Sequence, residues 1–293
     1  MLASVKTQIM IMRKGKEYKA AFIGTFLYSS LAFIYALIIY AGKDLSLVKD
    51  ANQMVCFSEA NVWWLPFCIL WPFLIVLPFS TSYVDDYKNQ LLHVYFSKVS
   101  RRDYYVSKLV AAFAGTAFII AVSFLTNLLL CNCFFPHNGN TWIGEYQMPN
   151  FYRGLLGTNI DYDTPYPSIP FLRVYLFSPF LYNLIYILLF SSFSGLMSSF
   201  IMSLSFWLKK NKIILFAPVF ILTQLLRVID AQAFSKAIES RGFYINVNIF
   251  EYFSPLFSKG LVPFFLPGIF ILLFAIMICL TIFAINQDIR SLQ

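Results

Sequence analysis

The chain has few charged residues and lacks the short motifs that mark common enzymes. Charged residues make up 12% of its 293 positions and hydrophobic residues 59%, with a mean hydropathy of +0.69. These values exclude an ordinary soluble globular protein. The sequence contains neither a GxxxxGK[ST] phosphate-binding loop nor an HExxH zinc motif. We therefore expect no enzymatic activity, no nucleotide site and no metal or cofactor site in this chain.

Cysteine and acidic clusters offer little further chemistry. Cys131 and Cys133 have no second ligand pair, and Cys56 is the only cysteine clearly placed in an outer loop, so we expect packed thiols rather than disulfides or a zinc site. Asp85–Asp86 resembles half of an aspartate-rich, magnesium-binding prenyltransferase motif. No second cluster follows on the same side of the predicted membrane, which disfavours that chemistry.

Long apolar runs dominate what is present. A helix needs about 20 apolar residues to cross a hydrocarbon core of about 30 Å, and continuous runs favour helices over barrel strands. The sequence predicts an all-α membrane protein with six transmembrane helices. The predicted spans are residues 20–41, 62–82, 109–135, 174–207, 213–226 and 261–285, of which the fifth is the shortest.

Basic residues predict the orientation of these spans. With a cytosolic amino terminus, 14 of the 22 basic residues fall on the cytosolic side, as the positive-inside rule expects. Both termini are then cytosolic, and the basic charge is accounted for by topology and anionic lipid, with no need for nucleic acid. The cytosolic parts are a basic amphipathic segment (1–19), a connector (83–108), a short turn (208–212) and a tail (286–293). The outer loops are 42–61, 136–173 and 227–260.

The connector combines basic charge with an amphipathic pattern. Tyr83, Tyr87, Leu91 and Tyr95 recur every four residues, which predicts an aromatic and aliphatic stripe on one helix face. Such a helix could bind a cytosolic partner, or it could simply lie on the lipid surface, held by its tyrosines and lysines.

A second helix is predicted to begin inside the connector. The Ser100 hydroxyl is placed to accept from the Asp103 amide while the Asp103 carboxylate reaches back, and Asp103 also complements the positive end of the helix. We expect this helix to continue through Lys108 into the third span, with Tyr104 and Tyr105 at the level of the lipid headgroups.

These connector features resemble the segment after the second transmembrane helix of ABC-2 type permeases, the membrane subunits of many bacterial ABC exporters. In that family an acidic residue leads a helix, an apolar pair follows, and a PVSRxxYxxGK-like sequence opens the third span. This chain has Asp85 or Asp86, then Leu91–Leu92, then Lys98–Lys108. It departs from the pattern at Lys98, where proline is frequent, at Ser107, where glycine is frequent, and at Asn89–Gln90.

The resemblance implies a membrane permease subunit that lies in the bacterial plasma membrane and works with a separate ATPase subunit. ATP and magnesium would be bound by that ATPase, and a second permease subunit, identical or different, would complete the transporter. The cargo would be amphipathic, lipid-like or a peptide. The residues implied in coupling to the ATPase are Asp85, Asp86, Tyr87, Lys88, Leu91, Leu92, Tyr95 and Arg101. The alternative is a non-transporting membrane protein that uses the connector for docking, immunity or assembly.

Two patterns within the spans concern helix packing and bending. Small residues recur every four positions at Ser191, Gly195, Ser199 and Ser203. Such a strip lets another helix approach closely, within the chain, between subunits or beside a translocation path. Prolines at Pro66, Pro72 and Pro78 each remove a backbone hydrogen bond from the second span, giving either static kinks or a hinge.

Overall fold

A computed structural model gives the architecture of the chain for residues 1–43, 48–57, 62–137, 140–143, 146–149, 171, 174, 177–208, 212–240, 245–254, 262 and 264–290. In this part of the chain, five helices are long and apolar enough to cross a membrane, consistent with a multi-pass membrane protein. They are α2 (Lys16–Tyr40), α6 (Arg101–Phe134), α9 (Pro179–Trp207), α10 (Lys212–Ser240) and α11 (Phe265–Arg290).

Shorter elements complete the described fold. Helix α1 (Leu2–Lys14) precedes α2, and α3 (Trp64–Val76), α4 (Ser82–Lys88) and α5 (Leu92–Lys98) lie between α2 and α6. Strands β1 (Asn140–Ile143) and β2 (Tyr146–Pro149) pair antiparallel, and a 3-10 turn, η2 (Glu251–Phe253), precedes α11. The described fold is thus all-helical, as predicted, apart from this small hairpin in the loop 136–173.

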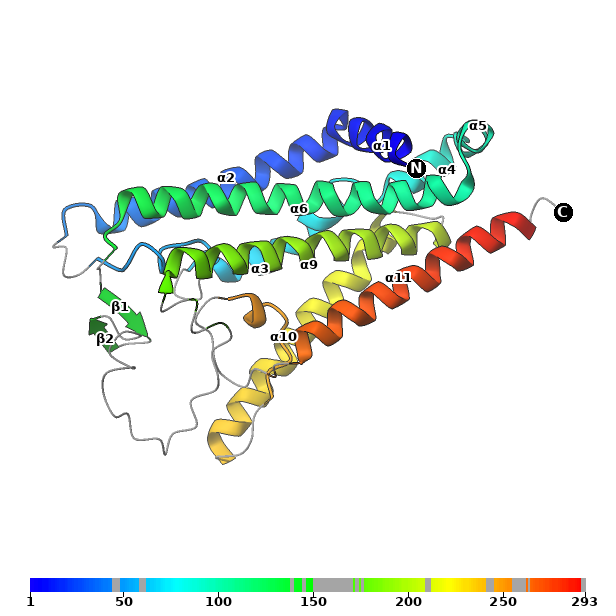
Figure 1. Cartoon of the computed structure of the whole chain (residues 1–293). Helices are drawn as coiled ribbons and strands as arrows, with labels where there is room; N and C mark the ends of the chain where they lie inside the picture. Colours follow the sequence, from blue (N-terminus) through cyan, green and yellow to red (C-terminus); the bar gives the residue numbers. More distant parts are fainter. Residues whose placement is uncertain are drawn as a thin grey trace.

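The helices form an elongated bundle with α6 and α9 at its centre. Figure 1 shows α2, α6 and α9 running side by side, while α10 and α11 cross the bundle obliquely. The amino terminus, α1, α4, α5 and the carboxyl end of α11 lie at one end, and the β hairpin lies at the other. The amino terminus, the carboxyl end of α11 and the connector thus share one end of the bundle, which we call the terminal end.

Two spans differ from their predicted lengths. In place of the span 62–82, α3 has 13 residues, about 20 Å at 1.5 Å per residue, and is too short to cross the hydrocarbon core alone. In place of the short span 213–226, α10 extends over 29 residues to Ser240, into the predicted outer loop 227–260. Helix α10 continues through polar positions because they find partners: the Arg227 guanidinium donates to Gln224 Oε1 at 3.2 Å, and Asp230 Oδ1 accepts from the Val247 amide at 2.8 Å.

The three prolines of the second span have different positions. Pro66 lies in the first turn of α3, where no intrahelical donor is required, and only Pro72 interrupts the helix interior. Pro78 follows the helix, in the turn before α4, and the Ser80 hydroxyl donates to the Ile75 carbonyl at 3.0 Å. Pro66 and Pro78 therefore mark the ends of α3, and of the three prolines only Pro72 lies in the interior of this helix.

The described part of the predicted outer loop 42–61 folds back into the bundle. Residues 51–57 are all buried, and the Phe57 ring stacks on Phe124 of α6 with centroids 5.6 Å apart. Phe124 lies ten residues before the end of α6, about 15 Å along the helix. A non-helical segment at that depth is tolerated only where protein groups satisfy its backbone.

Two asparagines within the apolar helices supply hydrogen-bond partners for the backbone of this segment. Asn127 Oδ1 accepts from the Cys56 amide at 2.9 Å, and its Nδ2 donates to the Ser29 carbonyl at 2.8 Å. Asn183 Nδ2 donates to the Asn52 carbonyl at 3.0 Å. The segment 48–57, which we call the re-entrant segment, is therefore fixed between α2, α6 and α9.

The small-residue strip of α9 packs within the chain. A Cβ placed on Gly195 would lie 2.8 Å from the Phe113 carbonyl oxygen of α6, and the Ser199 hydroxyl donates to the Leu109 carbonyl at 2.9 Å. Ser191 and Ser203 are also buried. Of the three roles weighed for the strip, close packing of α9 on α6 is the one that these contacts support.

Candidate functional site

The connector forms two short helices joined by a tight turn. Helix α4 ends at Lys88, Gln90 has a φ of 56°, and α5 begins at Leu92. A left-handed residue cannot continue a right-handed helix. The predicted single helix face is therefore wrong: Tyr83 is fully buried in the bundle, whereas Tyr87 is 44% exposed.

The predicted start of the next helix is confirmed. Ser100 caps α6, with its hydroxyl accepting from the Asp103 amide at 3.1 Å, and α6 then runs without a break to Phe134. The Asp103 carboxylate lies 3.5 Å from the amino group of Met1, which ties α1 to the foot of α6. Tyr104 and Tyr105, expected at the lipid headgroups, are instead buried within the protein.

A buried ion pair joins α4 to α6. Lys108 Nζ lies 2.6 Å from Asp86 Oδ2, and the two side chains are 2% and 13% exposed. The Tyr104 hydroxyl donates to the same carboxylate oxygen at 2.6 Å, and Lys108 also donates to Ser82 Oγ at 3.0 Å. The Lys108 ammonium lies 4.9 Å from the centre of the Phe79 ring, a cation–π contact.

The energetics of this pair favour a fixed geometry. Removing two charges from water is costly, and the cost is offset only when the charges meet each other and further hydrogen-bonding groups. Here Tyr104 and Ser82 supply those groups. The three links hold α4 and the first two turns of α6 as one unit.

An aromatic cluster extends the unit to α5 and α9. Phe206 of α9 packs edge-on against Tyr83 and Tyr105, with ring centroids 4.9 and 4.7 Å away. From α5, Tyr95 and Phe96 reach Tyr104 at 5.3 and 5.4 Å. Burial of the Tyr95 hydroxyl, and secondarily the negative charge of Asp86, raise the pKa of Tyr95 above its usual value. The two connector helices are thus packed on the central pair of the bundle.

The remaining predicted coupling residues divide into two groups. Tyr87, Lys88 and Leu91 are exposed, whereas Asp85, Leu92, Tyr95 and Arg101 are half-buried. The Arg101 guanidinium lies 5.4 Å from the centre of the Phe96 ring, so it supports α5 from the start of α6. Asp86, which the resemblance implied in coupling, belongs to the buried ion pair.

Exposed apolar side chains give the connector a surface at the terminal end. Tyr87, Leu91 and Val94 are 44%, 39% and 53% exposed, and they stand on α4, the turn and α5 respectively. We call these three residues the connector surface. Lys88 and His93, both exposed, flank it with polar groups.

Sequence reasoning missed Lys108 and Tyr104 as partners of Asp86. A signal was present, because a lysine at the foot of an apolar helix needs a counter-ion when it is buried. Within the connector, the candidate carboxylates are Asp85, Asp86 and Asp103.

Helix α1 packs on the same foot of α6. The Ser4 hydroxyl donates to Ser107 Oγ at 3.0 Å, and Met12 is buried against Gly115, where a Cβ would lie 2.2 Å from the Met12 sulfur. The predicted basic amphipathic segment 1–19 therefore contains α1, which contacts the bundle beside the connector, and the start of α2.

Comparison of the chain with protein-family models, curated protein sequences and solved structures gave no match.

Proposed function

We propose that this chain is the membrane permease subunit of an ATP-driven exporter of the ABC-2 type, in which the connector couples a separate ATPase subunit to the bundle. The observation that carries the proposal is the buried Asp86–Lys108 pair, which joins a connector with an exposed apolar surface to the longest helix described. A merely surface-lying connector would not require a desolvated ion pair to the span.

Coupling would follow a short mechanical path. The ATPase subunit, which would bind ATP and magnesium, docks on Tyr87, Leu91 and Val94. Its movement passes from α5 through Tyr95 and Phe96 to Tyr104, and from α4 through Asp86 to Lys108. Because packed interiors transmit displacement rather than absorbing it, α6 and α9 would move with the connector.

The packed interior leaves no room for cargo among the described core residues. Among the described residues, the centre of the bundle is filled by aromatic rings: Trp71 stacks on Phe193 at 5.6 Å, and Phe67 and Phe190 lie beside Phe124 at 5.0 and 6.1 Å. A path for an amphipathic, lipid-like or peptide cargo would therefore run along a surface shared with a second permease subunit. The same packing favours the second candidate, a non-transporting docking, immunity or assembly protein.

Site-specific photocrosslinking tests the proposal. A photoreactive amino acid replaces Leu91 on the connector surface, and a matched variant carries it at Ile271 of α11, which is 70% exposed on the apolar face. We expect Leu91 to crosslink a P-loop ATPase, identified by mass spectrometry, and Ile271 not to do so. Recovery of the ATPase from neither position would contradict the exporter assignment.

A transport assay distinguishes the exporter from the non-transporting docking protein. The chain and the captured ATPase are reconstituted together in vesicles, and ATP-dependent movement of fluorescent lipid or peptide is measured. An exporter moves cargo only with hydrolysable ATP. A stable complex without nucleotide-dependent movement of cargo would favour the docking protein.

A further inference from the structure

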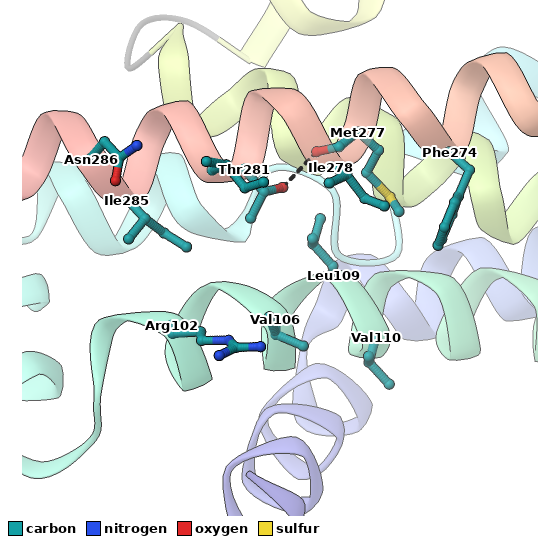
Figure 2. A pocket seen from close by; sticks show the side chains of 11 residues that line it. Arg102, Val106, Leu109, Val110, Phe274, Met277, Ile278, Thr281, Ile285 and Asn286 are labelled. Carbon is teal, nitrogen blue, oxygen red and sulfur yellow. Dashed lines mark hydrogen bonds between the residues drawn. The ribbon is translucent and has the colours of Figure 1, made fainter.

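A groove between α6 and α11 combines an apolar wall with one charged end. Its volume is about 590 Å³, and Figure 2 shows the side chains that line it. They come from the start of α6 and the later part of α11, and Figure 1 shows that these parts of the two helices lie towards the terminal end. The lining comes from one face of each helix: Arg102, Val106, Leu109 and Val110 from α6, and Phe274, Met277, Ile278, Thr281, Ile282, Ile285 and Asn286 from α11.

The polarity of the groove changes along its length. Figure 2 shows Arg102 and Asn286 at one end and Phe274 and Val110 at the other. Thr281 does not interrupt the apolar wall, because its hydroxyl donates to the Met277 carbonyl of its own helix at 2.7 Å. The polar end is also the end where α6 begins and α11 finishes, and so faces the predicted cytosolic side.

Arg102 is the charged group at that end. Among the side chains that the structure describes, Asp86 pairs with Lys108 and Asp103 pairs with the amino group of Met1. Neither of these ion pairs includes Arg102. Its neighbour Arg101 differs, since that guanidinium is stacked over Phe96. An exposed guanidinium beside an apolar groove is suited to an anion attached to a hydrocarbon chain.

We propose that this groove binds an anionic phospholipid of the cytosolic leaflet, with the phosphate on Arg102 and one acyl chain along α6 and α11. From Arg102 to Val110 the helix rises about 12 Å, which accommodates roughly the first half of an acyl chain. The Asn286 amide supplies donors for ester or phosphate oxygens. A second copy of this chain fits less well, because a packed apolar helix brings no anion to Arg102.

Lipid titration of the purified chain tests the proposal. Delipidated protein in detergent is titrated with phosphatidylglycerol or with phosphatidylcholine of the same acyl chains, and bound lipid is counted by native mass spectrometry. We expect one phosphatidylglycerol to be retained preferentially. Arg102→Gln should weaken that binding by about tenfold or more, as expected for loss of a charge-assisted hydrogen bond.

Two matched variants separate a site from general surface charge. Arg101→Gln removes the same charge from the adjacent position, outside the groove, and should leave retention of phosphatidylglycerol unchanged. Val110→Trp fills the apolar end with Arg102 intact, and should reduce retention without altering the helical circular dichroism. It also keeps the proposal testable if Arg102→Gln fails to fold.

Three results would overturn the inference. Equal retention of the two lipids by the wild-type chain would show that the groove does not select an anionic headgroup. Equal losses in Arg101→Gln and Arg102→Gln would indicate diffuse charge rather than a site. Disulfide formation between two copies, each carrying a cysteine at Ile278, would show that a second chain covers the groove.

Discussion

The ammonium of Lys108 and the carboxylate of Asp86 meet at 2.6 Å although they are 22 positions apart in the sequence, and the contact fixes the connector to the longest helix described. Neither partner is stable in that place without the other, because an unpaired buried charge carries the full cost of desolvation. This property leads to the first prediction.

Lys108→Met should lower the free energy of unfolding by about 3–5 kcal/mol, because the Asp86 carboxylate is left buried without its counter-ion. Asp86→Asn should also destabilise the chain, and the double variant should recover part of the loss. The measurement is unfolding in detergent, arranged as a double-mutant cycle. Lys88→Met, at an exposed lysine of α4, is the control and should change stability little. Additive effects of the two substitutions would show that the pair is not coupled.

The re-entrant segment gives a second prediction. Asn127→Leu keeps the side-chain size but removes the acceptor of the Cys56 amide, at a cost of about 1–3 kcal/mol for a buried group left unpaired, and also removes the donor to the Ser29 carbonyl. The segment should loosen. Cys56, which is buried in the wild-type chain, should then react with a water-soluble maleimide in a background lacking the exposed Cys133 and Cys279.

The matched control for that experiment is Asn132→Leu. Among the contacts described, the Asn132 side chain donates only to the Leu128 carbonyl of its own helix. Replacing Asn132 should therefore not expose Cys56. Equal labelling of Cys56 in both variants would show that Asn127 does not hold the segment.

Close packing of α9 on α6 gives a third prediction. Gly195→Ala should destabilise the bundle by about 1–3 kcal/mol, because the new methyl group meets a backbone oxygen, which cannot move aside as a side chain can. Gly24→Ala in α2, where no atom lies within 4 Å of the added Cβ, should be neutral or slightly stabilising. Thermal unfolding of the two variants compares them directly, and equal melting temperatures would refute the close contact.

Local patterns predicted the parts of the fold that depend on neighbouring residues. The Ser100 cap and the unbroken helix behind it follow from four consecutive residues and a hydrophobic run. The helices of the bundle follow from hydropathy, because lipid requires apolar side chains and internal backbone hydrogen bonds.

The remaining features depend on contacts between distant residues. In the sequence, Asn127 and Asn183 are isolated polar residues within apolar runs, and only the folded chain places the re-entrant segment against them. The connector stripe was misplaced because one residue, Gln90, adopts a left-handed conformation that its sequence does not demand. Helix α10 was predicted too short because Arg227 and Asp230 lower the hydropathy of a stretch in which both find hydrogen-bond partners.

Ionisation of Tyr95 gives the last prediction and reports on the docking of α5. Burial, with the charge of Asp86 as a smaller cause, raises the pKa of Tyr95 above the usual value of about 10. The folded chain therefore keeps Tyr95 protonated where the unfolded chain ionises it, so this residue stabilises the fold below about pH 10 and loses that contribution as the pH rises through its raised pKa.

Tyrosinate absorbance of the wild-type chain minus that of Tyr95→Phe isolates this titration, with a midpoint expected above 10. Asp86→Asn should lower the midpoint, since the neighbouring negative charge is removed. A midpoint at the ordinary value in the folded chain would mean that α5 is not packed on Tyr104.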